Sequence, residues 1–276
     1  MSRIAARFAS LATQGRGALI PYLEAFDPDY DTALALLKAM PAAGADLIEI
    51  GVPFSDPSAD GPVIQQAALR GLKAGSTMTG VLKMVAQFRE EDQDTPVILM
   101  GYLNPIETYG YERFCKDAAN AGVDGLIIVD LPPEEADVIE PHTDASGLDI
   151  IRLVAPTTSD ERLRYVLSHA SGFVYYVSIT GITGTRTASA ADLREVLPRL
   201  RAATKLPVAI GFGIRSPEQA ATAASIADGA VVASALLATL ADTLDAEGRA
   251  TEQTLPRVLQ QIRELAAAVR AAGSAG

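Results

Sequence analysis

The chain has 276 residues, of which 49% are hydrophobic and 21% charged, so a sizeable core can form and wholesale disorder is excluded. Its 34 acidic and 23 basic residues give a net charge of -11, which argues against binding to nucleic acid or to an anionic membrane surface. The single cysteine, Cys115, excludes an internal disulfide framework and a cysteine-based metal cluster.

Short β-like runs alternate with longer helical segments along the chain. The predicted strands are residues 18–23, 46–50, 96–100, 125–129, 149–154, 173–177, 207–210 and 230–232. Most are continuous apolar runs, which is typical of parallel strands covered on both faces. The predicted helices are residues 32–40, 62–73, 78–90, 109–121, 133–144, 159–169, 190–203, 216–226 and 253–272, with an extra helix over 2–14.

Local signals support this alternation. Ser159 and Ser216 each precede an acidic first turn, and Gly44 and Gly122 are typical helix stops before a strand. Eight strands, each followed by a helix within this length, predict an α/β fold: a single (β/α)8 TIM barrel over residues 1–276 with an extra N-terminal helix. The first residues lack the apolar run of a signal peptide, and no stretch approaches about eighteen apolar residues, so a cytoplasmic protein is expected.

Glu49 is the most informative single residue. It is a carboxylate between Ile48 and Ile50, inside a run that predicts a buried strand. Because neighbours along a strand point to opposite faces, Glu49 lines the barrel interior if these two isoleucines pack under helices. An acid in an apolar barrel mouth should have a raised pKa, which suits proton transfer near neutrality. The alternative is a structural carboxylate paired with an arginine.

Two further acids, Asp56 and Asp60, follow the same strand in a loop rich in proline and serine. Active sites of this fold lie at the C-terminal ends of the strands, so either acid could reach over the barrel mouth. A turn acid or a helix N-cap before Pro62 explains the spacing equally well.

Glycine-rich turns follow the last strands of the chain. They are Thr180-Gly181-Ile182-Thr183-Gly184, Gly211-Phe212-Gly213-Ile214, and Ala233-Ser234 before a further helical run. Such turns, with a helix N-terminus, form the usual phosphate site of a barrel, because glycine lets backbone N–H groups approach the anion closely. Each alone fits a plain tight turn, but together they predict a phosphorylated substrate.

The positions of the lysines and histidines argue against several kinds of catalytic site. None of the lysines follows a strand, which argues against a Schiff-base aldolase. The two histidines, His142 and His169, fall at the opposite end of the barrel, which argues against a histidine-ligated metal or a histidine-activated nucleophile. Metal-free acid–base chemistry by carboxylates on a small phosphorylated substrate is what remains.

Five motifs, in order, resemble the signature of the tryptophan synthase α subunit family. They are Leu47 to Pro62, Met100-Gly101-Tyr102-Leu103-Asn104-Pro105, Val129-Asp130-Leu131-Pro132, Tyr175 to Gly184, and Gly211-Phe212-Gly213-Ile214. The resemblance covers essentially the whole chain, and its most specific part is the segment from Glu49 to Pro62. It implies retro-aldol cleavage of indole-3-glycerol phosphate to indole and glyceraldehyde 3-phosphate, without a metal.

The resemblance also implies residue roles. Glu49 matches the general acid/base, Asp60 the acceptor for the indole N–H, and Tyr175 a tyrosine near the reacting carbons. The matches to the indole pocket are Tyr22, Met100, Ile127 and Phe212, and those to the phosphate cradle are Gly184, Gly213 and Ser234. Thr183 matches a residue that closes onto Asp60.

The resemblance further implies a partner. Pro53 and Asp56 match positions that contact a β subunit in an α2β2 assembly, and indole passes to that subunit through a tunnel. Pyridoxal phosphate is expected only in the β subunit, so no cofactor is expected in this chain.

Three positions depart from the family pattern. Glu24 stands where a small or hydroxyl residue is usual; it either faces the mouth as a third carboxylate, altering the tuning of Glu49, or points outward and is inert. Phe26 replaces a glycine that could supply an unusual backbone angle, and it could narrow the β interface. Ala233 replaces a glycine of the phosphate cradle, which is tolerated if the backbone angle there is ordinary.

These departures leave alternatives open. One is a stand-alone lyase that releases free indole. Another is a divergent or engineered member kept mainly as an allosteric partner of the β subunit. A third is a barrel with a new substrate built around Glu24.

Overall fold

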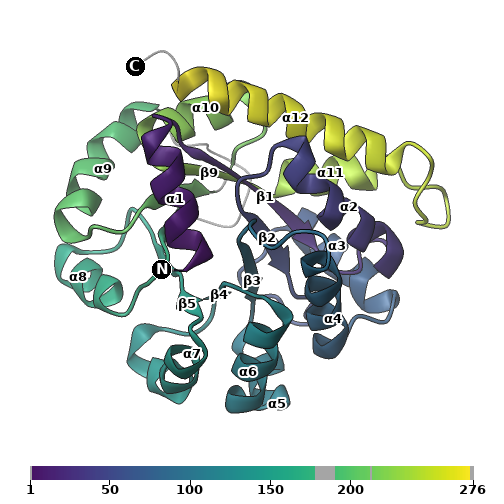
Figure 1. Cartoon of the computed structure of the whole chain (residues 1–276), viewed down its shortest axis with the longest axis horizontal. Helices are drawn as coiled ribbons and strands as arrows, with labels where there is room; N and C mark the ends of the chain where they lie inside the picture. Colours follow the sequence, from purple (N-terminus) through teal and green to yellow (C-terminus); the bar gives the residue numbers. More distant parts are fainter. Residues whose placement is uncertain (1, 178–189, 212, 274–276) are drawn as a thin grey trace.

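The computed structural model describes residues 2–177, 190–211 and 213–273, and these form a barrel of parallel strands surrounded by helices (Figure 1). The strands are β1 (Ala18–Glu24), β2 (Ile48–Gly51), β3 (Val97–Gly101), β4 (Gly125–Ile128), β5 (Asp149–Ile150), β6 (Arg152–Val154), β7 (Val174–Val177), β8 (Val208–Gly211) and β9 (Gly229–Val232). Every described strand pair is parallel.

The helices lie outside this sheet. They are α1 (Arg3–Thr13), α2 (Tyr30–Ala43), α3 (Pro62–Lys73), α4 (Met78–Arg89), α5 (Leu103–Tyr109), α6 (Tyr111–Ala121), α7 (Glu140–Ser146), α8 (Asp160–Ser168), α9 (Ala190–Ala203), α10 (Pro217–Ile226), α11 (Ser234–Ala241) and α12 (Thr254–Gly273), with a 3-10 helix over Pro133–Val138. The predicted alternation of strand and helix is confirmed.

The strand order closes the barrel. It runs β5-β4-β3-β2-β1-β9-β8-β7-β6, and only Ile151 separates β5 from β6 in the chain. The predicted strand 149–154 is therefore one stave in two parts: its first half pairs with β4 and its second half with β7. The nine segments amount to the eight staves of the predicted barrel.

Two helix predictions were wrong in detail. The predicted helix 109–121 begins earlier as α5 and breaks at Gly110, whose φ of 94° suits glycine and interrupts the helix. The predicted helix 133–144 starts as the 3-10 turn and becomes α7 only at Glu140, where Pro141 stands in the first turn.

Alternation along the strands divides the apolar residues into two cores. Residues such as Ile48 and Ile50 pack outward against the helices. Their inward neighbours fill the barrel, and at its N-terminal end α1 adds Ile4, Phe8 and Leu11 to the same cluster. The Phe8 ring lies 5.6 Å from that of Phe173. The N-terminal end of the barrel is thus plugged.

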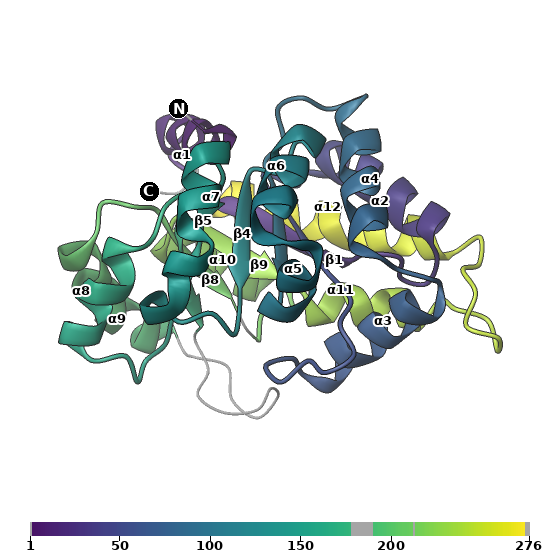
Figure 2. The same cartoon turned by 90° about the horizontal axis from the view of Figure 1, so that it is seen from below.

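The two ends of the barrel are on opposite sides of the molecule. Figure 2 shows α1 on one side, and α3 with the loop that precedes it on the other. The C-terminal ends of the strands face the second side, so the predicted site residues gather at the end that α1 does not cover.

Candidate functional site

Glu49 lies inside the barrel. Its neighbours Ile48 and Ile50 belong to the outer core, so strand alternation turns Glu49 inward beside Ile98 of β3. The residue is fully buried, and among the described residues neither carboxylate oxygen has a hydrogen-bond partner. Burial raises the pKa of Glu49 to about 8. The carboxyl therefore holds its proton at neutral pH and can give it to a substrate.

Asp60 ends the loop between β2 and α3 and is half-buried. The hydroxyl of Tyr102 donates to its Oδ2 over 3.0 Å and accepts the N–H of Ala59 at the same distance. Burial raises the pKa of Asp60, and the Tyr102 hydrogen bond opposes that rise. The ring of Phe54 packs on Tyr102 with centroids 5.2 Å apart. An aromatic residue at the end of β3 thus fixes Asp60 at the mouth.

Tyr175 points into the barrel from β7 and is 3% exposed. Its ring lies over Gly211 of β8, where an added Cβ would come within 2.0 Å of the phenolic oxygen. Burial, and then the nearby charge of Glu49, hold the pKa of Tyr175 well above its usual range. The phenol therefore stays protonated close to Glu49.

Tyr22, Met100 and Ile127 project from β1, β3 and β4. Tyr22 and Met100 belong to an apolar cluster that also contains Ile64 of α3 and Leu237 of α11. Ile127 is fully buried in the inner barrel core. The apolar walls of the mouth therefore come from both the strands and the helices beside it.

The structure describes two of the three residues predicted to bind the phosphate. Gly213 follows β8 with a left-handed φ of 82°, and Ser234 is the first residue of α11. The N-cap of α11 is Ala233, so no side chain caps its first turn. A free helix N-terminus presents N–H groups to an anion. Thr183, Gly184 and Phe212 lie outside the described residues.

The two predicted partner contacts differ in exposure. Asp56 is exposed and accepts a hydrogen bond from the Ser55 hydroxyl at 2.5 Å. Pro53 is buried, and its ring lies beside Gly71 of α3. In this chain alone, the outer part of the loop is the part open to a partner.

Two searches cover the part of the chain that the structure describes. No group of three or more His, Cys, Asp or Glu residues there could hold a metal ion. None of the helices described is both long and apolar enough to span a membrane. His169 sits at the C-terminal end of α8, where its Nδ1 lies 3.1 Å from Glu140 and away from the mouth, as predicted.

Comparisons with known proteins agree over nearly the whole length of the chain. The family model described as Tryptophan synthase alpha chain matches residues 8–270. The tryptophan synthase alpha chain of Gluconacetobacter diazotrophicus is 73% identical, and the match covers 98% of this chain and 98% of the relative. That of Gluconobacter oxydans is 70% identical, over 98% of this chain and 100% of the relative. The chain belongs to the tryptophan synthase alpha chain family.

Solved structures agree with this family. The tryptophan synthase subunit alpha of Legionella pneumophila is 41% identical with a TM-score of 0.89, and the two cover 98% of each other. A structure of Mycobacterium tuberculosis tryptophan synthase is 38% identical with a TM-score of 0.87, again over 98% of each chain. The chain is therefore an alpha chain lyase of tryptophan biosynthesis. Alpha chains of this family carry no cofactor; pyridoxal phosphate belongs to the β subunit.

The structure resolves the three departures from the alpha chain pattern. Glu24 is buried at the mouth, so the alternative that it points outward was wrong. Phe26 has the unusual backbone angle, with φ 64°, and its ring is buried 5.0 Å from that of Tyr30. Its ring therefore packs in the core. Ala233 has φ -115° and ψ -78°, so its backbone does not occupy the left-handed region that favours glycine.

Sequence reasoning assigned no role to Tyr102 or Gly51. Tyr102 stands in the Met100–Pro105 motif, and its hydroxyl at a strand end was the available signal. An added Cβ at Gly51 would lie 1.8 Å from the Tyr22 hydroxyl oxygen. No sequence pattern reveals this close approach, because it depends on the register of β1 and β2.

Proposed function

We propose that this alpha chain cleaves indole-3-glycerol phosphate to indole and glyceraldehyde 3-phosphate, with Glu49 as both general acid and general base. The observation that carries the proposal is the isolated, buried Glu49 carboxyl, whose oxygens have no partner among the described residues and whose pKa is about 8. Such a group is protonated before reaction and becomes a base once it has donated.

The reaction begins with a proton transfer from Glu49 to C3 of the indole. C3 becomes tetrahedral, and the positive charge moves to the ring nitrogen. Asp60 accepts the indole N–H and stabilises that charge, because a carboxylate held at a fixed place favours the positive charge that develops beside it. The Tyr102 hydrogen bond, which favours the ionised form of Asp60, supports this role.

Bond cleavage follows. The Glu49 carboxylate takes the proton of the hydroxyl on the glycerol carbon bonded to C3, and that carbon becomes the aldehyde carbon. The electrons of the broken carbon–carbon bond return to the ring and restore aromatic indole. Glu49 ends protonated, as it began, so no external acid or base is consumed.

The remaining site residues bind the two ends of the substrate. Tyr22, Met100, Ile127 and Phe212 would surround the indole, and Tyr175 would lie near the reacting carbons. The backbone at Gly184, Gly213 and Ser234 would hold the phosphate, and Thr183 would close onto Asp60.

A β subunit is the proposed partner, in an α2β2 assembly of the cytoplasm. Pro53 and Asp56 belong to the loop that leads to Asp60, so contact there would couple the partner to the site. Indole would pass directly to the β subunit. The match to Mycobacterium tuberculosis tryptophan synthase supports an assembly of this kind.

The test is indole release from indole-3-glycerol phosphate by the purified chain, with and without a β subunit. Slow release that the β subunit accelerates is the expected result. Fast release without it would favour a stand-alone lyase. Stimulation of the β subunit by a chain that releases no indole would favour a purely regulatory role, and no effect in either assay contradicts the proposal.

A further inference from the structure

A third carboxyl group lies at the barrel mouth and has no part in the reaction above. Glu24 is the last residue of β1 and is 1% exposed. The hydroxyl of Tyr22, two residues earlier on the same strand, donates to its Oε2 over 2.5 Å. The two side chains form one buried polar unit, here called the Tyr22–Glu24 pair.

Space for this pair comes from the neighbouring strand. Gly51 of β2 stands opposite Glu24 in the register. An added Cβ at Gly51 would lie 1.8 Å from the Tyr22 hydroxyl oxygen and 2.4 Å from Glu24 Oε2. Any other residue at position 51 would displace the pair, so the pair and the glycine fit each other.

The pair lies among the groups of the proposed site. Tyr22 is opposite Glu49 in the register of β1 and β2, and its ring packs in the apolar cluster with Met100. Burial is the largest cause of the raised pKa of the Tyr22 phenol, and the charges of Glu24, Asp60 and Glu49 raise it further. Tyr22 is therefore the residue that connects the third carboxyl to the other two.

Charge explains why Glu24 can hold the phenol without disturbing the site. The nearby Arg70 is bound to Asp27 through two hydrogen bonds of 2.6 and 2.8 Å, so no cation pairs with Glu24 among the described residues. Burial raises the pKa of Glu24 to about 8, and the charges of Asp60 and Asp27 add to this rise. The hydrogen bond from Tyr22 and the charge of Arg70 lower the pKa, but they do not cancel the effect of burial. A neutral carboxyl adds no negative charge beside Asp60 at neutral pH.

We propose that Glu24 is a positioning residue: its carboxyl holds the Tyr22 hydroxyl over Gly51 and so fixes the ring that forms the β1 wall of the indole pocket. The inference rests on the proposed function, because it assumes that an indole ring packs there. Glu24 touches no reacting atom in the proposed reaction, so its loss should weaken binding of the indole and leave the proton transfers largely intact.

The experiment compares Glu24→Met with Glu24→Gln. Methionine keeps the volume and loses the acceptor, whereas glutamine keeps an acceptor oxygen for the phenol. The probe is indole-3-propanol phosphate, which lacks the hydroxyl needed for cleavage. The chain contains no tryptophan, so the fluorescence of the probe is read against tyrosine alone.

We expect Glu24→Met to weaken probe binding, and to raise KM, by about three- to tenfold, the usual worth of one hydrogen bond, with a smaller change in kcat. Glu24→Gln should restore binding to near the wild-type value. In a Tyr22→Phe background, Glu24→Met should add no further loss. The matched control is Tyr109→Phe, which removes a 2.8 Å bond to Asp117 on the outer helices and should leave binding unchanged.

Three results would overturn the inference. They are equal losses in Glu24→Met and Glu24→Gln, an undiminished Glu24→Met effect in the Tyr22→Phe background, and a loss of kcat without a change in KM. Glu24→Gln and Tyr22→Phe are conservative enough to keep the comparison open if Glu24→Met does not fold. A wild-type chain that neither binds the probe nor releases indole would instead overturn the proposed function, and this inference with it.

Discussion

The carboxyl groups at the N-terminal end of the barrel and those of the proposed site at its C-terminal end have different partners. At the N-terminal end, Asp46, Asp124 and Asp228 each accept a backbone N–H of the neighbouring strand, from Leu19, Val97 and Val208. Each also pairs with an arginine, at 2.8, 2.7 and 3.3 Å. At the C-terminal end, neither Glu24, Glu49 nor Asp60 forms an ion pair within the described chain.

This difference separates stability from chemistry. A carboxylate that is paired and hydrogen-bonded at a strand start orders the barrel and stays charged. A buried carboxyl without a cation costs stability when ionised, so Glu24 and Glu49 keep their protons at neutral pH, whereas Asp60 is half-buried and accepts a hydrogen bond from Tyr102. The carboxyl groups of the proposed site are therefore expected to stabilise the fold less than the arginine-paired carboxylates of the N-terminal end.

The largest expected effect is on catalysis. Glu49→Gln should reduce indole release by about 10²–10⁴-fold, because an amide can neither donate nor accept the required protons. The variant should fold, since glutamine has the size of glutamate and the site already leaves both oxygens unpartnered. Activity within tenfold of wild type, measured by the release of indole in the presence of a β subunit, would contradict the role of Glu49.

The second effect is on stability at the opposite end. Arg89 donates to Asp124 over 2.7 Å and to the Gly122 and Thr95 carbonyls, so Arg89→Met should cost about 3–5 kcal/mol in urea unfolding. Activity per folded molecule should be unchanged. Arg113→Met is the control, because that arginine is 71% exposed and its ion pair should be worth under about 1 kcal/mol.

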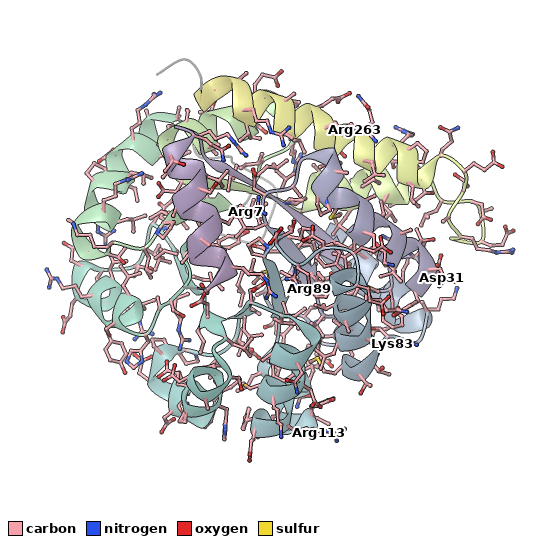
Figure 3. The ribbon with its side chains drawn as sticks, viewed as in Figure 1. Arg7, Asp31, Lys83, Arg89, Arg113 and Arg263 are labelled. Carbon is pink, nitrogen blue, oxygen red and sulfur yellow. The ribbon has the colours of Figure 1, made fainter. Side chains whose placement is uncertain are left out.

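Figure 3 shows the contrast between these two arginines: Arg89 lies toward the middle of the face that α1 covers, and Arg113 lies at the rim. Equal losses of stability in the two variants would mean that burial of the N-terminal network has no energetic weight. A loss of activity per folded molecule in Arg89→Met would mean that the two ends are coupled.

The third effect is the dependence of stability on pH. The pKa of Glu49 is about 8 in the folded chain, against an ordinary value of 4.5. Between these values the unfolded chain has released a proton that the folded chain keeps, so stability falls as pH rises and levels off above about 8. The unfolding free energy of Glu49→Gln, relative to wild type, should therefore rise by up to about 1.4 kcal/mol per pH unit across this window. A constant difference from pH 5 to 9 would show that Glu49 is ionised in the folded state.

The smallest effect concerns the turn after β1. Phe26 has φ 64°, a conformation that costs a non-glycine residue about 1–2 kcal/mol. Phe26→Ala and Phe26→Gly both lose the buried ring, but the glycine variant should be about 1 kcal/mol more stable, because it also loses the strain. If residue 26 had an ordinary negative φ, the alanine variant would be the more stable of the two. The measurement is urea unfolding of both variants, and the sign of the difference in their unfolding free energies tests the strain at Phe26.

Much of this molecule could be predicted from the sequence because barrel strands and helices carry strong periodic signals. The eight staves, the α1 helix and the inward direction of Glu49 follow from alternation alone. What the sequence did not reveal depends on register and packing. The break at Ile151, the Tyr22–Glu24 pair over Gly51, and the hydrogen bond from Tyr102 to Asp60 all join residues whose proximity is set by neighbouring strands and loops.

Phe26 shows the same limit from the other side. A phenylalanine in the left-handed region contradicts local preference, and only the packing of its ring beside Tyr30 and Gly80 explains why it is tolerated. Local rules fail here because tertiary packing offsets the backbone cost.

The plug formed by α1 determines how small molecules move through the barrel. From Glu49 toward the N-terminal end, the barrel interior is filled by Ile20 and Leu47, and α1 adds the ring of Phe8 beside that of Phe173. Among the described residues the N-terminal end offers no path, so substrate, aldehyde and indole are expected to use the opening at the C-terminal end. A protein bound over that opening would set how long substrate, aldehyde and indole stay in the barrel, without touching a reacting atom.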